Sequence, residues 1–424
     1  MDKNAKSSAS TRREFMGHAA AMGAGVLALG AGARAAADAP LRVGLIGAGR
    51  RGTGAARDCI MADKHVVVSA VGDLFPDALA AGVEKLATLG KRFTATRETC
   101  FSGWDAYEQV INCDVDLVLL CEPPAFRPLH LRAAVEAGRH VFMEKPAAVD
   151  PVGVRSVLAS AALADEKGLC IVSGAQRRHQ PSYRDIIRRI HDGAVGAIVS
   201  AACYWIGDYD YYPAVPRQPG WSDMEWQLRN WNYFTWLSGD HIVEQHLHNI
   251  DVINWVLNAH PVSAVGMGGR SQRTGPEYGH IYDHFAVEFE YPGGIRVQSL
   301  CRQNRDTYRR VSEHIVGTLG VANPGRSITG PKAHTFDGQD ANPYVQEHVH
   351  LIEAIRSGEP LNEGRDLAES TLAAIMGRMS AYTGQEVHWD WALNTSTLDL
   401  TPPAWEMGPL PVPPVAAPGV DTLV

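Results

Sequence analysis

The sequence has 424 residues, of which 45% are hydrophobic and 20% charged, a composition typical of a globular protein with a large core. At this length we expect two domains. The formal net charge of −8, without long runs of lysine or arginine, argues against a nucleic-acid-binding surface, so we expect no nucleic acid among the partners. Seven cysteines without CxxC spacing exclude a full disulfide framework and a structural zinc knuckle.

The N-terminal segment has the features of an export signal. Arg12 and Arg13 precede a short Ala/Gly-rich apolar run, residues 19–31, and Ala35-Ala36-Ala37 then offers an A-x-A cleavage site. The apolar run is too short to span a bilayer. We therefore predict that residues 1–37 are a twin-arginine signal peptide, which directs a soluble mature chain through the Tat export machinery to the periplasm or the exterior. The alternative is a disordered basic leader of a cytosolic protein.

A glycine-rich motif follows the first strand of the expected mature chain. The apolar run Leu41–Ile46 predicts a buried parallel strand, and Gly47-Ala48-Gly49-Arg50-Arg51-Gly52 comes directly after it. A helix-compatible stretch runs through Met61, and a second apolar run ends at Asp73. This order of strand, glycine loop, helix, strand and acid predicts a dinucleotide site with the phosphates at the helix N-terminus.

Each conspicuous residue of this motif has a separate expected role. Gly47 permits the tight turn, Gly49 lets the backbone approach the pyrophosphate, and Gly52 lets the helix pack closely on the strand. Asp73 would accept a hydrogen bond from the ribose 2′-hydroxyl and repel a 2′-phosphate, so NAD is favoured over NADP. Either arginine of the loop could pair with a phosphate, which would admit NADP as well. The alternative is a glycine-rich turn that binds nothing.

Strands and helices continue to alternate further along the chain. This alternation predicts an α/β fold with a doubly wound parallel sheet, the Rossmann fold. The further strands are expected at residues 115–120, 140–143 and 169–172, and the helices at residues 126–137 and 152–167.

One of these strands ends in the tripeptide Glu144-Lys145-Pro146, after Ala137-Gly138 and downstream of the glycine loop. On these elements the chain resembles the Gfo/Idh/MocA oxidoreductase family over nearly all of its mature length. The resemblance implies that the peptide before the proline is often cis and that Lys145 is catalytic, bonding a substrate hydroxyl or ketone beside the nicotinamide. A cation at this edge of a parallel sheet can also stabilise a developing alkoxide. The alternative is a surface lysine paired with Glu144.

The resemblance also assigns side chains to the cofactor cleft. NAD is the expected cofactor. The residues expected to bind it are Gly47, Gly49, Arg50, Arg51, Gly52, Asp73, Trp104, Tyr107, Pro123, Glu144, Lys145 and Gln176.

The composition changes after the expected Rossmann domain. Residues 204–255 contain six of the ten tryptophans. Aromatic faces stack on the C–H faces of sugars, so the segment is consistent with a carbohydrate or polyol substrate. An aromatic core or a subunit interface would have the same composition.

The densest polar cluster of the chain begins at Gly239 and is expected to open a helix, on which Glu244 and His248 share a face. The family usually has an aspartate here, a histidine four residues later and an aspartate three beyond it. By this resemblance Glu244, His248 and Asp251 are catalytic candidates, with glutamate in place of the first aspartate. We expect His248 to act as general acid/base with a pKa of about 6.5. Glu244 would contact a substrate hydroxyl, and Asp251 would orient the imidazole or cap the local structure.

Two other interpretations of the cluster remain open. His241, Glu244, His246 and His248 could bind a metal, but on a helix His246 and His248 point to different sides, so we expect no metal. The histidines could also form a polar network between the domains.

The rest of the chain predicts an α+β domain with a mainly antiparallel open sheet. Residues 280–291 alternate in polarity, 292–294 form a turn and 295–301 return, a hairpin pattern. A sheet with one exposed face is a common dimer surface in the family, so we expect a homo-oligomer. Seven prolines from Pro402 onwards predict an extended tail that is solvated or reaches across a partner. The expected divisions are a signal peptide (1–37), a Rossmann domain (38–178), a substrate and oligomerisation domain (179–392) and a Pro-rich tail (393–424).

These features predict an exported, NAD-dependent oxidoreductase that transfers hydride to or from a sugar or polyol. Free NAD is scarce outside the cytoplasm, and the twin-arginine route carries folded proteins, so we expect a cofactor that stays bound through turnover. The second hypothesis is an NAD-dependent glycosidase or lyase that oxidises its sugar transiently and returns the hydride. The third is a non-enzymatic sugar-binding protein.

Overall fold

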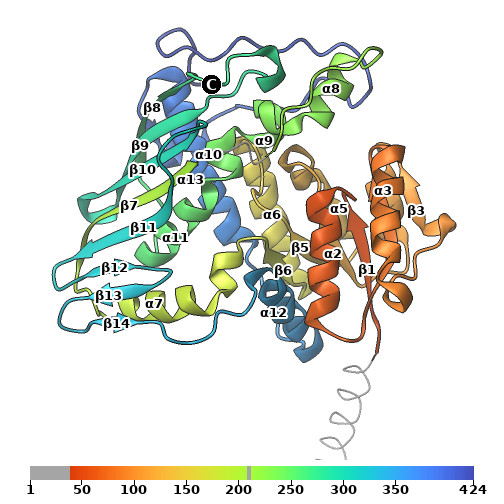
Figure 1. Ribbon diagram of the computed structural model, residues 1–424, viewed down its shortest axis with the longest axis horizontal. Coiled ribbons are helices and arrows are strands. Elements are labelled where there is room, and N and C mark those ends of the chain that lie inside the picture. The colour runs from red at the N-terminus through yellow and green to blue at the C-terminus, as the bar shows by residue number, and fades with distance from the viewer. Residues whose placement is uncertain (1–38, 208–211) are drawn as a thin grey trace, which may run out of the picture.

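The chain folds around two sheets that stand side by side (Figure 1). The computed structural model describes residues 39–207 and 212–424, so the expected signal peptide, residues 1–37, lies outside the described residues. One sheet is parallel and six-stranded, and the other is nine-stranded and mainly antiparallel. This arrangement confirms the fold class predicted from the sequence. Within the described ranges no helix combines the length and the apolarity needed to cross a membrane.

The parallel sheet has the strand order β3-β2-β1-β4-β5-β6 of a Rossmann fold. Its central strands are fully buried, which explains why they stand out in the sequence as continuous apolar runs. The strands are β1 (Leu41–Ile46), β2 (Val66–Asp73), β3 (Cys100–Ser102), β4 (Leu117–Leu120), β5 (His140–Met143) and β6 (Ile171–Ser173). The helices are α2 (Arg50–Ala62), α3 (Pro76–Ala87), α4 (Ala106–Asn112), α5 (Arg127–Glu136) and α6 (Pro151–Lys167).

The segment from α3 to α4 was not predicted from the sequence. The short strand β3 is only partly buried at the edge of the sheet, and only two of the twelve residues of α3, Gly82 and Leu86, are buried. Elements with so little buried surface have only a weak pattern of apolar residues, so they are hard to predict from the sequence.

The second sheet has the order β14-β13-β12-β11-β7-β10-β9-β8-β15. The predicted hairpin is present as β9 and β10, but β10 also pairs in parallel with β7, which lies about ninety residues earlier. The strands are β7 (Ile198–Gly207), β8 (Ser263–Gly269), β9 (His284–Tyr291), β10 (Ile295–Gln303), β11 (Arg310–Gly317), β12 (Val321–Asn323), β13 (Ser327–Thr329), β14 (His334–Thr335) and β15 (Val387–His388).

Helices fill the space between the two sheets (Figure 1). The long helix α13 packs on both the nine-stranded sheet and α6, and α12 returns to the Rossmann domain and packs on α2. The helices of this part are α7 (Pro181–His191), α8 (Asp223–Arg229), α9 (Thr235–Ser238), α10 (His241–Glu244), α11 (Leu247–Leu257), α12 (Pro343–Ser357), α13 (Gly364–Thr383) and α14 (Trp389–Asn394).

The proline-rich C-terminal tail lies along its own chain and crosses to the region of α8 (Figure 1). The ring of Trp405 packs against Trp104 and Phe126 of the Rossmann domain and against Trp236 of the second domain. Further along the tail, the backbone carbonyl of Leu410 accepts a hydrogen bond from the Gln227 side chain. The expectation of a solvated tail is therefore wrong for the segment around Trp405, because this half-buried ring packs against both domains.

Candidate active site

The loops at the carboxyl ends of the parallel strands open into a cavity of roughly 570 Å³ between the two domains. This is the size of a small-molecule site, at the position where open α/β sheets bind their ligands. All twelve residues predicted to contact the cofactor line the cavity, and so do three of the four catalytic candidates, Lys145, Glu244 and His248. The cavity is therefore the candidate active site.

The glycine loop has the shape that a dinucleotide phosphate requires. Gly47 has a φ of +89°, and a Cβ there would lie 2.7 Å from the backbone nitrogen of Glu122. A Cβ on Gly52 would lie 1.8 Å from the carbonyl oxygen of Gly47, whereas one on Gly49 would meet nothing within 4 Å. The N-terminus of α2 also has no side-chain cap, which leaves its N–H groups available to an anion. The loop thus fits the pyrophosphate of NAD.

Asp73 ends β2 at the cavity, as expected. Its carboxylate accepts hydrogen bonds from the backbone nitrogens of Ala48 (2.7 Å) and Phe75 (3.0 Å). Burial raises the pKa of Asp73, and these two backbone donors oppose that rise. Each oxygen keeps a lone pair for a ribose hydroxyl. The fixed carboxylate would face a 2′-phosphate directly, so the site fits NAD better than NADP.

Arg51 does not face a phosphate as the sequence suggested. Its guanidinium turns inward and forms ion pairs with Glu144, with Asp58 at 3.2 Å and with Glu347 at 3.0 Å. Burial alone would lower the pKa of Arg51, but Glu144 and Glu347 raise it above the ordinary value. The arginine therefore positions Glu144, which precedes Lys145. Arg50 remains on the exposed side of the loop, over the ring of Tyr212.

Lys145 projects into the cavity from a cis Lys145–Pro146 peptide, the isomer that the resemblance implies. Its Nζ lies 2.7 Å from Oε1 of Glu244 and also donates to the Glu244 backbone carbonyl. The side chain is only 13% exposed. The alternative of a surface lysine whose ammonium pairs with Glu144 is therefore wrong, because the partner is Glu244 of the second domain.

The predicted helix through the polar cluster is broken into two. Helix α10 ends at Glu244 and α11 begins at Leu247, so Gln245 and His246 form a kink. The kink buries the His246 ring against the sheet, where Nε2 lies 2.8 Å from the Ser299 hydroxyl. Glu244 and His248 still reach the cavity, whereas His246 points away from it. In the described part of the chain, no three metal-binding side chains come together.

His248 lines the cavity in a buried setting, with its ring stacked on Trp205 at 5.9 Å between centroids. Burial lowers the pKa of His248 well below its ordinary value, and the charges of Lys145 and Arg177 lower it further. The expectation of an unperturbed pKa is therefore wrong. The imidazole is neutral at physiological pH and presents both a donor and an acceptor to a substrate.

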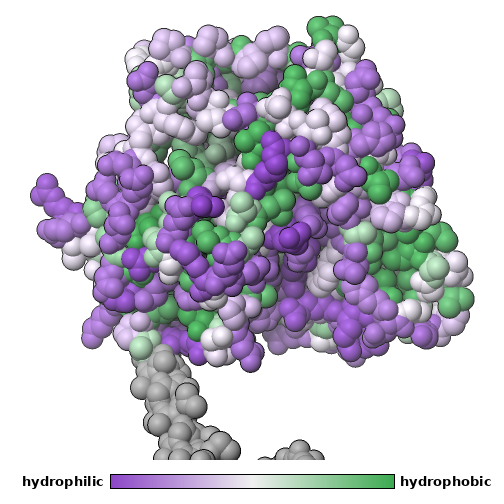
Figure 2. All heavy atoms as spheres, turned by 180° about the vertical axis from the view of Figure 1, so that it is seen from behind, coloured by the Kyte–Doolittle hydropathy of each residue, from purple (hydrophilic) through white to green (hydrophobic). Residues whose placement is uncertain are grey.

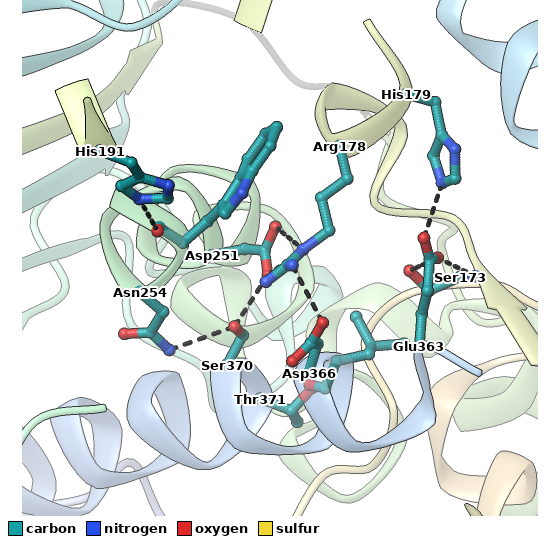
Figure 3. Close-up of polar contacts among 12 residues, drawn as sticks. Ser173, Arg178, His179, His191, Asp251, Asn254, Glu363, Asp366, Ser370 and Thr371 are labelled. Atoms are coloured by element: carbon teal, nitrogen blue, oxygen red, sulfur yellow. Dashed lines mark hydrogen bonds and ion pairs between the residues drawn. The ribbon is translucent and has the colours of Figure 1, made fainter. Parts of the chain in front are cut away.

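Asp251 is not part of the site. Figure 3 shows its carboxylate held by Arg178, with contacts of 2.8 to 3.1 Å, and by the hydroxyl of Ser370 at 2.8 Å. Asp251 is buried one helical turn beyond His248 and does not line the cavity. The predicted catalytic role is wrong, because a nearby arginine engages both carboxylate oxygens. Asp251 instead ties α11 to α13 and to the segment that leaves the Rossmann domain.

Glu122 and Gln245 are among the residues of the cavity wall that were missed in the sequence. Glu122 is the second residue after β4, and its buried carboxylate lies 3.4 Å from Nδ1 of His130. A charged residue just after a buried parallel strand was the available signal, since ligands bind at this edge. Gln245 reaches the cavity only because the helix is kinked, so regular helical spacing could not reveal it.

Helix α8 closes the cavity on the side of Asp73. Arg229 of α8 pairs with Asp77 of α3 through contacts of 2.9 and 3.1 Å, and its guanidinium lies 3.9 Å from the centre of the Phe75 ring. The centre of the Trp221 ring lies 5.2 Å from the same guanidinium. A segment of the second domain thus bridges to the edge of the nucleotide-binding domain over the end of β2.

Several buried histidines predict acid sensitivity. Burial lowers the pKa of His246 to about 3 and of His280 to about 4, and lowers those of His248 and His348 well below the ordinary value. In the unfolded chain each ring takes up a proton near pH 6.5. Below that pH the unfolded state binds more protons than the folded state, so stability is lost as pH falls.

We expect His246→Gln to reduce this loss by about 0.7 kcal/mol per pH unit near pH 6.5, rising towards about 1.4 kcal/mol per pH unit near pH 5. Urea unfolding at several pH values measures the slope. His388→Gln is the matched control for the substitution itself, because the His388 side chain is 65% exposed. An unaltered slope in His246→Gln would contradict the assignment of a buried, neutral ring.

Comparison with known proteins agrees with the fold. Residues 41–174 match the family described as "Oxidoreductase family, NAD-binding Rossmann fold", and residues 183–323 match the "GFO/IDH/MocA C-terminal domain". Inositol 2-dehydrogenase 3 of Saccharopolyspora erythraea is 28% identical over 320 residues, which cover 74% of this chain and 82% of that protein. The scyllo-inositol 2-dehydrogenase (NAD(+)) of Bacillus subtilis is 23% identical over 366 residues, 82% of this chain and 96% of that protein.

Solved structures show the same fold at lower identity. A levoglucosan dehydrogenase in complex with NADH and levoglucosan superposes with a TM-score of 0.65 at 18% identity, over 82% of this chain and 99% of that one. The aldose-aldose oxidoreductase of Caulobacter crescentus superposes with a TM-score of 0.64 at 19% identity, over the same shares of the two chains. With both of its domains matched, the chain belongs to the Gfo/Idh/MocA family of oxidoreductases and uses NAD.

Proposed function

We propose that the protein transfers hydride between a sugar or polyol and an NAD molecule that it keeps bound through turnover. One observation carries the proposal: Lys145, Glu244 and His248 converge on the same cavity as the glycine loop and Asp73. The relatives named as inositol dehydrogenases act on polyols, and this supports the substrate class. The tryptophan-rich wall of the cavity, which includes Trp205, Trp221 and Trp231, supports it as well.

Lys145, Glu244 and His248 have separate roles in the oxidation of an alcohol. Bound NAD supplies the two-electron acceptor for the hydride. The ammonium of Lys145 donates a hydrogen bond to the reacting oxygen and stabilises its developing negative charge. Glu244 holds that ammonium in place from the opposite domain. The neutral ring of His248 offers a lone pair to the hydroxyl proton and, in the reverse direction, returns the proton to the ketone.

The test begins with the purified mature protein. Denaturation should release NAD(H) in about equal amount to the protein, although none was added. The loaded enzyme is then mixed with scyllo-inositol, myo-inositol, D-glucose or levoglucosan, and the absorbance of the reduced nicotinamide is followed. Oxidation of at least one compound is expected. An empty protein would contradict the retained cofactor, and failure with every polyol and sugar would contradict the substrate class.

The docking of α8 supports a retained cofactor. Arg229 links the second domain to Asp77, beside the ribose-binding Asp73. The tail lies against α8 from outside, where the Met224 backbone donates to the carbonyl of Gly408. A dinucleotide that lies between Asp73 and the glycine loop could leave only after this segment lifts.

We expect Arg229→Ala to accelerate NAD release about tenfold, because it removes a partly exposed ion pair and a cation–π contact. Stopped-flow exchange against a fluorescent NAD analogue measures the rate. Arg217→Ala is the matched control, since the guanidinium of Arg217 pairs with Asp223 and with the backbone carbonyl of Trp221, both in the same segment. Equal release rates in both variants would argue against a closing role for α8.

A second candidate function shares the retained cofactor. An NAD-dependent glycosidase or lyase would oxidise its sugar transiently, cleave the bond, and return the hydride to the same carbon. Closure of α8 suits this chemistry, because the reduced cofactor must remain for the second step. A sugar labelled with deuterium at the oxidised carbon separates the two: label retained in a cleaved product supports the glycosidase.

We further propose that the chain is exported through the Tat machinery. The support is the paired Arg12-Arg13 ahead of an apolar run and an A-x-A site, all outside the described residues. Replacing both arginines by lysine should leave the protein, uncleaved, in the cytoplasm, as fractionation and mass spectrometry would show. Export of the double variant at the rate of the original would overturn the proposal.

We propose that the protein forms a homo-oligomer through the outer face of the nine-stranded sheet. Val265 and Met267 of β8 are 52% and 73% exposed there. Figure 2 shows hydrophobic side chains gathered on the second domain when the molecule is seen from behind. Light scattering of the purified protein should give a multiple of the monomer mass, and Met267→Glu should reduce it.

A further inference from the structure

Gln245 is a cavity residue to which the mechanism above gives no role. It lies in the kink between α10 and α11, directly after Glu244, and is only 4% exposed. Its side chain lines the same cavity as Lys145 and His248. A buried amide at a ligand site is held by specific hydrogen bonds, and these decide which end of it meets the ligand.

A chain of side chains fixes the orientation of this amide. Nη1 of Arg273 donates to Oε1 of Gln303 at 2.5 Å, and Nε2 of Gln303 donates to Oε1 of Gln245 at 2.5 Å. A guanidinium can only donate, so the Gln303 atom that faces it must be the oxygen. The nitrogen of Gln303 then faces Gln245, which must present its own oxygen in turn. The direction of both amides follows from the arginine alone.

The nitrogen of Gln245 is left for the cavity. No described residue accepts a hydrogen bond from Nε2 of Gln245. This nitrogen is also not fully buried by the protein, so it is accessible from the cavity. The chain begins at a buried cation, Arg273, and hydrogen bonds in such a chain polarise one another. The cavity therefore receives a strengthened donor at this point, in an orientation that cannot invert.

The residue that carries this donor is covalently joined to Glu244, the residue that holds Lys145. Nζ of Lys145 donates to the backbone carbonyl of Glu244, and that carbonyl belongs to the peptide bond that leads to Gln245. The two donors thus enter the cavity from adjacent positions. A ligand that satisfies both must carry two neighbouring oxygens that accept.

We propose that Gln245 is a positioning and specificity-determining residue that donates to the oxygen on the carbon next to the one oxidised. The proposal rests on the proposed function, since it requires a polyol or sugar in this cavity. The enzyme then selects substrates with a vicinal hydroxyl or carbonyl. A deoxy sugar at that position loses the bond and leaves a buried donor without a partner.

The sharpest test changes a residue that does not line the cavity. In Gln303→Glu, the carboxylate can only accept, so it takes a donor from Arg273 on one side and from Nε2 of Gln245 on the other. Gln245 must then turn its oxygen towards the cavity. We expect KM for the vicinal substrate to rise at least tenfold, with a smaller change in kcat and an unchanged content of bound NAD.

Two further variants complete the experiment. Gln245→Glu, which replaces the donor itself, should also raise KM. The proposal can therefore still be tested if one of the two variants does not fold. Gln272→Glu makes the same chemical change at an exposed position of the Arg273 loop and should leave KM unaltered.

The substrate is the compound of the four tested above that the enzyme oxidises fastest, and its vicinal deoxy form is the probe. Wild type and Gln303→Glu should differ on the substrate and agree on the deoxy form. Equal KM values on the parent compound overturn the role of Gln245 and leave the proposed function intact. Failure of the wild type with every compound overturns the proposed function and this inference with it.

Discussion

Replacing Lys145 by methionine is expected to lower kcat by about three orders of magnitude while the protein keeps its bound NAD. The ammonium is the cation that stabilises the developing charge on the reacting oxygen, and loss of one such donor typically costs about 10²- to 10³-fold in rate. Methionine fills a similar volume without the charge. Hydride transfer measured in a single turnover, with the release of NAD on denaturation as the loading check, gives both quantities.

The partner of Lys145 needs a control of its own. Glu244 is buried, and without the lysine its carboxylate loses the cation 2.7 Å away, which could destabilise the chain and mimic a catalytic defect. The double variant Lys145→Met/Glu244→Gln removes both charges together. We expect it to recover stability but not rate. A rate within tenfold of the wild type in either variant would contradict the catalytic assignment.

Replacing Arg51 by methionine is expected to destabilise the protein by about 3–5 kcal/mol. Arg51 is the shared cation of Glu144, Asp58 and Glu347, and the Glu347 side chain is fully buried. Removal of one partner from a buried charge cluster lowers the stability by more than the intact cluster adds to it. The reason is that the remaining charges are still desolvated but have lost their partner. Urea unfolding measures the loss, and bound NAD is expected to fall with it, since Arg51 belongs to the glycine loop.

Matched variants identify the cause of that loss. Burial raises the pKa of Glu347 well above its ordinary value, and the charge of Arg51 opposes the rise. Without the arginine, Glu347 is the carboxylate left at greatest cost, so adding Glu347→Gln should restore part of the stability. Arg57→Met, on the exposed side of the same helix, should change little. Equal stability of Arg51→Met and Arg57→Met would overturn this account.

Part of the candidate site could be predicted because its determinants are local. The glycine loop joins a strand to a helix within a few residues. Gly47 avoids a clash with the adjacent β4 loop, Gly52 avoids one with the loop's own backbone, and Gly49 leaves open space for a ligand. Lys145 is the second residue after the buried strand β5, whose apolar run can be recognised in the sequence alone. A parallel sheet brings such strand ends to one edge, so the cavity follows from the order of the elements.

The errors concern side chains whose partners lie far along the chain. The family resemblance made Asp251 a candidate to orient the ring of His248, but Arg178, 73 residues away, takes its carboxylate. Arg51 was one of two arginines considered for a phosphate, but Glu347, 296 residues away, helps to turn it inward. Spacing within one helix or strand predicts which residues share a face. It does not predict which charged residue from a distant part of the sequence will pair with them.

By itself, the sequence determined the nucleotide-binding fold, NAD as cofactor and the family of this protein, because short-range patterns of apolar runs, glycines and the Glu-Lys-Pro tripeptide carry that information. Only the tertiary structure decided that Lys145 pairs with Glu244, that burial keeps His248 neutral, and that α8 docks on α3. Burial and ion pairing are properties of the folded surroundings, to which segments dozens to hundreds of residues apart contribute.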